Sequence, residues 1–263
     1  MPRSALVPTL LCLATIPAAA GELSIVGTGD GIELLRAIGA AYSAAHPQTT
    51  IVVPPSIGSG GAIVAVGSDK EVLGRVARPL TASEKAQGLV ATALVRLPSA
   101  FFVHPSARVD ALTAAQIADI YGGGRITNWK DVGGADLKIR VVRREDADST
   151  LMALRAAMPG WKDLRITDRS KTALTTQDAI DTVRQVEGAI GFAPYTRQLE
   201  QGTVVLKVDG RFPTDADFPS AVTVSFIHKE DTVTPEARDF LAFARSAAAR
   251  ALISTLGGVP ATQ

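Results

Sequence analysis

Three short loops of similar composition each follow a predicted strand and lead into a predicted helix. Their sequences are GTGDGIELL (27–35), IGSGGAIVAV (57–66) and RREDADSTLMAL (143–154). The first turn of a helix leaves backbone N–H groups without partners and carries the positive end of the helix dipole, so it attracts anions. Glycines allow the backbone to approach a ligand closely, and hydroxyl side chains add donors. These residue types predict the binding of a small oxyanion.

The same residues also suit plain helix capping, and both interpretations stay open at this point. Asp30 with Glu33 fits an acidic capping box, Ser59 fits the cap of the second helix, and Asp148 or Ser149 fits the cap of the third. In a parallel α/β protein, loops of this kind gather at the carboxyl ends of the strands, where ligands bind. An oxyanion site is therefore as good an interpretation as capping.

Single residues argue against other kinds of site, such as a dinucleotide-binding loop, a nucleophile elbow or a metal site. A dinucleotide-binding loop is disfavoured because Ile32 stands where the third glycine belongs and no acid ends the second strand, at Val53-Pro54-Pro55. Residue 57 is isoleucine, so the stretch around Ser59 is not a nucleophile elbow. The three histidines stand far apart with no paired spacing. We therefore expect neither a metal nor a cofactor.

The composition and the amino-terminal segment limit the class of protein. Residues 1–20 carry one arginine, no acids, a short apolar run and a final Ala-Ala-Ala, which predicts a cleaved secretory signal peptide. Removing Arg3 from 27 basic residues leaves 26 against 26 acidic ones, and Cys12 is lost with the same segment. A neutral chain does not favour nucleic acid or an anionic membrane as a partner. An exported, neutral and cysteine-free chain indicates the bacterial periplasm.

Predicted strands and helices alternate along the rest of the chain, which is typical of α/β proteins with a largely parallel sheet. Strands are expected at 22–27, 50–53, 94–105, 138–142, 188–192, 203–208 and 221–228. Helices are expected at 31–45, around 63, at 112–121, 150–158 and 176–186, and from 235 to the glycines at 257–258. Segment 122–134 is expected to be a loop.

A resemblance to a known family covers nearly the whole chain after residue 20. Its motifs are SIGSGGAI (56–63), LGRVARPLTASE (73–84), FFVHPS (101–106), IYGGGRITNWKDVGG (120–134), VVRREDADST (141–150) and GAIGF (188–192). In this order they resemble the periplasmic phosphate-binding proteins of ABC transporters. The resemblance implies a two-lobed type II periplasmic binding protein fold, in which each lobe is a mainly parallel sheet flanked by helices and the ligand binds between the lobes. It implies residues 21–93 with 205–263 in lobe 1 and residues 94–204 in lobe 2.

The resemblance also implies a set of ligand-binding residues. The backbone N–H groups at the first helix, the serine loop before the second helix and the arginine loop of lobe 2 would contact the anion. The residues implied are Gly31, Ile32, Ser59, Gly60, Arg144, Ser149 and Thr150.

The sequence departs from the family at a residue that matters for the ligand. The family's aspartate that accepts a proton from phosphate is Ala77 here, while acids stand at Asp30 and Asp148. An ionised carboxylate beside a dianion costs energy unless the ligand presents a proton to it. We therefore expect Asp148 or Asp30 to replace the missing aspartate, with helix capping as the alternative role of Asp148.

We expect an exported, monomeric binding protein that captures an inorganic oxyanion and delivers it to the membrane permease of an ABC transporter. Phosphate is the expected ligand. A periplasmic sensor that reports the same ligand to a membrane receptor or sensor kinase is an alternative. An exported phosphoester hydrolase using Ser59 or Asp148 is a third, but no plausible base or metal accompanies these residues. We therefore assign no catalytic residue.

Overall fold

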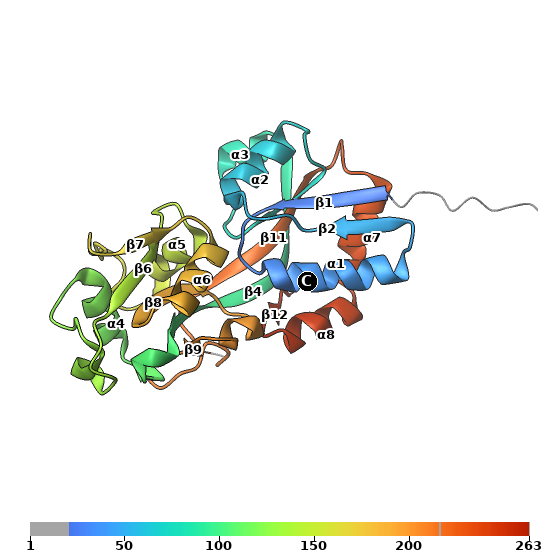
Figure 1. Ribbon diagram of the computed structural model, residues 1–263. Coiled ribbons are helices and arrows are strands. Elements are labelled where there is room, and N and C mark those ends of the chain that lie inside the picture. Colours follow the sequence, from blue (N-terminus) through green and yellow to red (C-terminus); the bar gives the residue numbers. More distant parts are fainter. Residues whose placement is uncertain (1–20, 216, 263) are drawn as a thin grey trace, which may run out of the picture.

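Two bodies of mixed α/β structure, joined by two long strands, make up the computed structural model (Figure 1). The structure describes residues 21–215 and 217–262, so the predicted signal peptide with Cys12 lies outside the described residues. Among the residues it does describe, no helix is long and apolar enough to cross a membrane. We call the body around β1 lobe 1 and the body around β6 lobe 2.

Lobe 1 combines the amino-terminal and carboxyl-terminal parts of the chain. Its first elements are β1 (Gly21–Gly27), α1 (Ile32–Ala45), β2 (Thr49–Val52), α2 (Gly58–Gly67), β3 (Leu73–Val76) and α3 (Ala82–Ala86). Its last elements are β11 (Ala221–Lys229), α7 (Pro235–Ala244), α8 (Ala247–Thr255) and β12 (Val259–Pro260). Apolar side chains from both parts, such as Ile25, Leu35, Phe226 and Phe240, form one core. Burying this shared core holds the two distant segments together.

Lobe 2 is formed by the middle of the chain. Its strands are β5 (Ala111–Leu112), β6 (Arg140–Arg144), β7 (Lys171–Ala173), β8 (Ala189–Pro194), β9 (Val204–Val205) and β10 (Lys207–Val208). Its helices are α4 (Ala114–Gly122), α5 (Ser149–Ala157) and α6 (Thr176–Gln185), with short 3₁₀ turns at Pro105–Ala107, Trp129–Val132 and Arg197–Glu200. Phe101, Tyr121, Trp161 and Phe192 meet in its core with ring centroids 5.0 to 6.3 Å apart. These rings exclude water from the inner face of the sheet.

A single strand order runs through both lobes: β2-β1-β3-β11-β4-β8-β6-β7. The strands β2, β1 and β3 are parallel, as are β8, β6 and β7. Between them, β11 runs antiparallel to β3 and β4, and β4 (Leu89–Val103) runs antiparallel to β8. Each lobe is thus mainly parallel, and the long strands β4 and β11 are the crossover between the lobes.

The chain passes from the core of one lobe to the core of the other near these crossover strands. On β4, Leu97 belongs to the core of lobe 1 and Phe101 to that of lobe 2. Where the chain returns to lobe 1, Phe218, just before β11, belongs to the core of lobe 2, and Val222 on β11 belongs to the core of lobe 1. The division expected at residues 94 and 205 stays a prediction, and we propose that it lies nearer these core transitions.

The predicted long carboxyl-terminal helix was wrong in one respect. The chain forms two helices, because α7 ends at Ala244 and α8 begins at Ala247. The Ser246 side chain accepts a hydrogen bond from the N–H of Ala249 at 3.2 Å and so caps the new helix. The loop expected at 122–134 also contains the 3₁₀ turn at Trp129–Val132.

Candidate anion-binding site

The three loops singled out from the sequence meet where the lobes face each other. The Ser59 Oγ of lobe 1 lies 3.3 Å from the Ser149 Oγ of lobe 2. The Thr176 hydroxyl of lobe 2 donates a 2.8 Å hydrogen bond to Oδ1 of Asp30 in lobe 1. Contacts between β11 and α5 place the Ser149 end of lobe 2 against lobe 1. The starts of α1, α2, α5 and α6 therefore surround one buried position.

Asp30 does not cap α1, which corrects one prediction. The helix begins at Ile32, and its cap residue Gly31 has left-handed backbone angles with no side-chain cap bond. Asp30 is instead buried, with 1% of its surface exposed, and its N–H donates to the Thr28 hydroxyl at 3.2 Å. Its Oδ2 atom is buried and has no hydrogen-bond partner among the described residues. A buried acceptor oxygen without a protein partner is typical of a group that contacts a ligand.

The surroundings of Asp30 raise the pKa of its carboxyl group to about 7. Burial is the largest cause, and the negative charge of Asp148 adds to it. The hydrogen bond from Thr176, the charge of Arg144 and the bond with Thr28 act in the opposite direction. Asp30 can therefore gain or lose a proton near neutral pH.

Asp148 and Arg144 form an ion pair, and most of their hydrogen-bonding groups already have partners within the protein. Oδ1 of Asp148 accepts the N–H of Leu151 at 2.9 Å, which confirms the predicted cap of α5. Oδ2 accepts two hydrogen bonds from Arg144, at 3.1 Å from Nε and 2.9 Å from Nη2. Both carboxylate oxygens of Asp148 thus have partners.

Arg144 retains donors beyond this pair. Its third hydrogen bond, from Nη1, reaches the carbonyl of Ala173 at 2.8 Å. A guanidinium has five N–H donors, so the three bonds to described residues leave two. The side chain is 11% exposed, which places those donors in a largely water-excluded position.

Ser59 is held inside the first turn of α2 and does not cap it, another correction. The helix starts at Gly58 with Ile57 as its cap residue and no side-chain cap bond. The Ser59 Oγ accepts the N–H of Ala77 at 3.1 Å and keeps its own proton for a further partner such as Ser149. No histidine or carboxylate bonds to Ser59 in the part of the chain that the structure describes.

The remaining predicted residues fall into two groups. Thr150 is 1% exposed, and its Oγ1 has no partner among the residues described. Gly31 and Ile32 are buried beside Asp30, but the Ile32 N–H donates to the Gly29 carbonyl at 3.3 Å. Gly60 is exposed on α2 with open space around it. The role of Thr150 stays a prediction, supported by its burial next to Ser149, whereas Gly60 does not contribute a buried group.

Thr176 was not predicted as a site residue, although its hydroxyl contacts Asp30 across the lobes. Its helix was predicted, but the preceding segment lacks the glycines that marked the other loops. The neighbouring Gln177 also crosses between lobes, because its Nε2 donates to the Gly29 carbonyl at 3.0 Å. The signal available was a Thr-Thr pair, Thr175-Thr176, at the start of a predicted helix.

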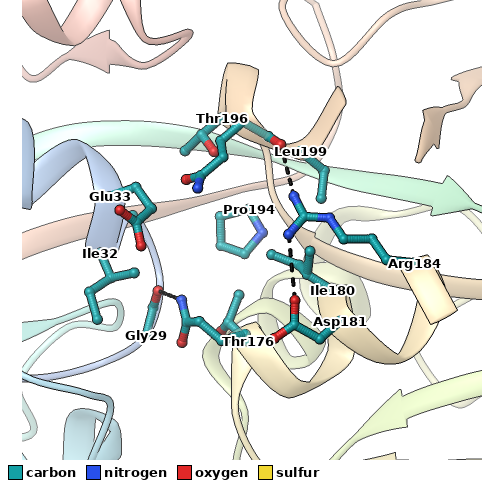
Figure 2. A pocket seen from close by; sticks show the side chains of 13 residues that line it. Gly29, Ile32, Glu33, Thr176, Ile180, Asp181, Arg184, Pro194, Thr196 and Leu199 are labelled. Atoms are coloured by element: carbon teal, nitrogen blue, oxygen red, sulfur yellow. Dashed lines mark hydrogen bonds and ion pairs between the residues drawn. The ribbon is translucent and has the colours of Figure 1, made fainter. Parts of the chain in front are cut away.

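A cavity of about 180 Å³ lies beside the buried position, at the rim between the lobes. Figure 2 shows Glu33 of α1 on one side of it and Asp181 and Arg184 of α6 on the other. Ile32 and Thr176 line the cavity as well, so it adjoins the Asp30 contact without containing Arg144 or Ser59. In the described part of the chain no group of three or more His, Cys, Asp or Glu residues could hold a metal ion.

The sequence and the fold are similar to those of known solute-binding proteins. The chain matches the PBP superfamily domain over residues 14–248, and it belongs to that family. It is 24% identical over 259 residues to the phosphate-binding protein PstS of Bacillus subtilis (strain 168), covering 93% of this chain and 82% of that relative.

Solved structures of phosphate-binding proteins have a similar fold. A protein from Clostridium perfringens assigned as a phosphate ABC transporter substrate-binding protein, with phosphate bound, superposes with a TM-score of 0.81 at 26% identity and covers 92% of this chain and 100% of its own. An ABC-type phosphate transport receptor from Vibrio cholerae has the same fold, with a TM-score of 0.64, 24% identity and the same two coverages. The family and the two-lobed α/β fold predicted from the sequence are confirmed.

Proposed function

We propose that this protein captures phosphate outside the cytoplasmic membrane and delivers it to the permease of an ABC transporter. The observation that carries the proposal is the meeting of the lobes at one buried position, where the Ser59 Oγ of lobe 1 lies 3.3 Å from the Ser149 Oγ of lobe 2. Arg144, whose charge acts on Asp30, and the buried, unpartnered Thr150 hydroxyl next to Ser149 support the same site among the described residues. The phosphate-bound relative of similar fold supports the same ligand. Binding without chemical conversion fits Ser59, which has no base beside it among the described residues.

Closing the lobes over an anion would remove water from it and pair it with these donors. Charge-assisted hydrogen bonds contribute about 1.5 to 3 kcal/mol each, which is roughly twice the value of neutral ones. Two remaining guanidinium donors of Arg144 and the buried Thr150 hydroxyl supply such bonds without breaking the pair with Asp148. The anion would then hold the lobes together.

We infer that Asp30, and not Asp148, replaces the aspartate missing at Ala77. Both oxygens of Asp148 already accept hydrogen bonds, whereas Oδ2 of Asp30 accepts none from the described residues. Phosphate and arsenate carry at least one proton near neutral pH and can donate it to this oxygen, while sulfate carries none. An ionised Asp30 beside sulfate brings two negatively charged groups into contact in a buried place, with no proton between them, which is unfavourable.

Isothermal titration calorimetry with phosphate, arsenate and sulfate tests the ligand. At pH 8, where Asp30 is mostly ionised, sulfate is expected to bind roughly tenfold or more weakly than phosphate, the effect of one buried group left unsatisfied. Equal affinity for the two anions would contradict the role of Asp30. No measurable binding of phosphate would contradict the proposed function itself.

Arg144→Ala tests the site. Losing two charge-assisted bonds is expected to weaken phosphate binding by about a hundredfold or more. In thermal unfolding, the wild-type protein gains about 2.7 kcal/mol at a hundredfold excess of ligand over Kd, and the variant loses this gain. Arg143→Ala is the matched control, because the neighbouring Arg143 pairs with the exposed Asp146. Equal stabilisation of both variants by phosphate would show that Arg144 does not bind the anion.

A further inference from the structure

Arg75 of β3 is a fully buried cation directly behind the first loop of the site. Its exposed fraction is 0%. Its guanidinium donates to three backbone carbonyls: Thr28 at 2.6 Å, Pro54 at 2.8 Å and Ile25. Its own carbonyl accepts the N–H of Thr28 at 3.1 Å. One residue therefore ties together the carboxyl ends of the parallel strands β1, β2 and β3.

The charge of Arg75 has no carboxylate in contact with it among the described residues. None of the ion pairs between these residues includes it, although Arg78 three positions along the chain pairs with Glu84 at 2.8 Å. The charged groups that act on Arg75 are Arg36 of α1, which repels it, and Asp30, which attracts it. Burial lowers the pKa of Arg75 to about 10, with Arg36 acting in the same direction and Asp30 against it.

An isolated charge in the protein interior is costly unless opposite charge lies nearby. Carbonyl dipoles satisfy the N–H groups of Arg75 but leave its net charge in place. The guanidinium contacts the loop from residue 27 to 31 at the carbonyl of Thr28, two residues before Asp30, and its buried surroundings screen the charge little. A cation in this place is expected to favour negative charge held by the same loop, whether on Asp30 or on a bound anion.

We propose that Arg75 is a second cation of the anion site, which positions the loop before α1 through backbone carbonyls and stabilises negative charge at the site without touching the ligand. The proposal rests on the proposed function for its ligand but not for its effect on Asp30. Arg75 is a positioning residue, in contrast to Arg144, which is proposed to contact the ligand directly.

The test compares Arg75→Met with Arg78→Met, which removes the same charge from a neighbouring, partly exposed ion pair with Glu84. Phosphate affinity is measured by calorimetry at pH 8. The pKa of Asp30 is measured without ligand by carboxyl ¹³C NMR, and Asp30→Asn assigns the signal. Arg75→Met is expected to raise Kd for phosphate roughly tenfold or more and to raise the pKa of Asp30 above its wild-type value. Arg78→Met is expected to change neither.

The outcomes separate the two proposals. A folded Arg75→Met protein with wild-type affinity and an unchanged Asp30 titration overturns the role of Arg75. If the wild-type protein binds no phosphate, the proposed function fails, and the titration of Asp30 still decides about Arg75.

Arg75→Lys carries the test if Arg75→Met does not fold, because lysine keeps the charge but not the planar fork. The lysine variant is expected to keep the wild-type Asp30 titration, because the charge stays, but to bind phosphate roughly threefold or more weakly, because at least one carbonyl bond to the loop is lost. An Asp30 titration shifted to higher pH in this charge-conserving variant would overturn the electrostatic role, and an unchanged Kd would overturn the positioning role.

Discussion

Asp30→Asn should change how the stability of the protein depends on pH. The substitution keeps the size of the side chain and an oxygen that can accept the Thr176 hydroxyl, but it removes the ionisable group. In the folded protein burial and Asp148 raise the pKa of Asp30 to about 7, against an ordinary value of 3.8. Between these two values the folded protein holds a proton that the unfolded chain has lost.

The sign and size of the effect follow from this difference. The contribution of Asp30 to stability is greatest below pH 3.8 and falls as the pH rises toward 7, because in that window this group holds a proton in the folded state that it has lost in the unfolded state. At 1.36 kcal/mol per pH unit, the loss reaches at most about 4 kcal/mol above pH 7. Asp30→Asn removes this loss, so the variant should match wild type near pH 4 and be more stable by up to that amount at pH 8.

Urea unfolding of ligand-free protein at several pH values between 4 and 8 measures the difference. Asp146→Asn is a suitable control, because its carboxylate is 70% exposed and lies in a surface pair with Arg143. The control should run parallel to wild type across the range. If the Asp30→Asn curve is also parallel to wild type, Asp30 is not a buried group of raised pKa, and its proposed role in reading the ligand's proton fails with it.

Three further variants test the geometry of the site. Thr176→Val removes the hydroxyl that lowers the pKa of Asp30, so the carboxyl ¹³C titration should move to higher pH; an unmoved titration contradicts the contact. Gly31→Ala forces a side chain into a backbone with φ of 68°, with its Cβ 2.9 Å from the Leu97 side chain. It should cost about 1 to 2 kcal/mol of unfolding free energy in urea, and a neutral result would show that the loop adjusts. Ser59→Cys with Ser149→Cys should form a disulfide on oxidation, because the two Oγ atoms lie 3.3 Å apart. The crosslink should abolish phosphate binding, because it replaces two proposed hydroxyl donors, and failure to form it would place the lobes farther apart in solution.

Much of the fold could be predicted from local patterns. Apolar periodicity located most strands and helices to within a few residues, because one face of each element is buried. It did not separate α7 from α8, since the apolar residues continue through Ser246 while the break is a local cap. It also underestimated β4, whose first residues pair with β11 far along the chain.

Within the site, the sequence by itself determined which loops could bind an anion and that Arg144 stands among them, since residue type and helix starts are local properties. It could not decide what Asp30 and Ser59 do, because capping and ligand binding use the same residue types. Only the tertiary structure decided this, by burying Asp30 against Thr176 of the other lobe and by filling both oxygens of Asp148. It also placed Arg75, an ordinary strand residue in the sequence, behind the first loop without a counter-charge in contact among the described residues. The reason is physical: burial, partners and electrostatic fields come from residues far apart in the chain.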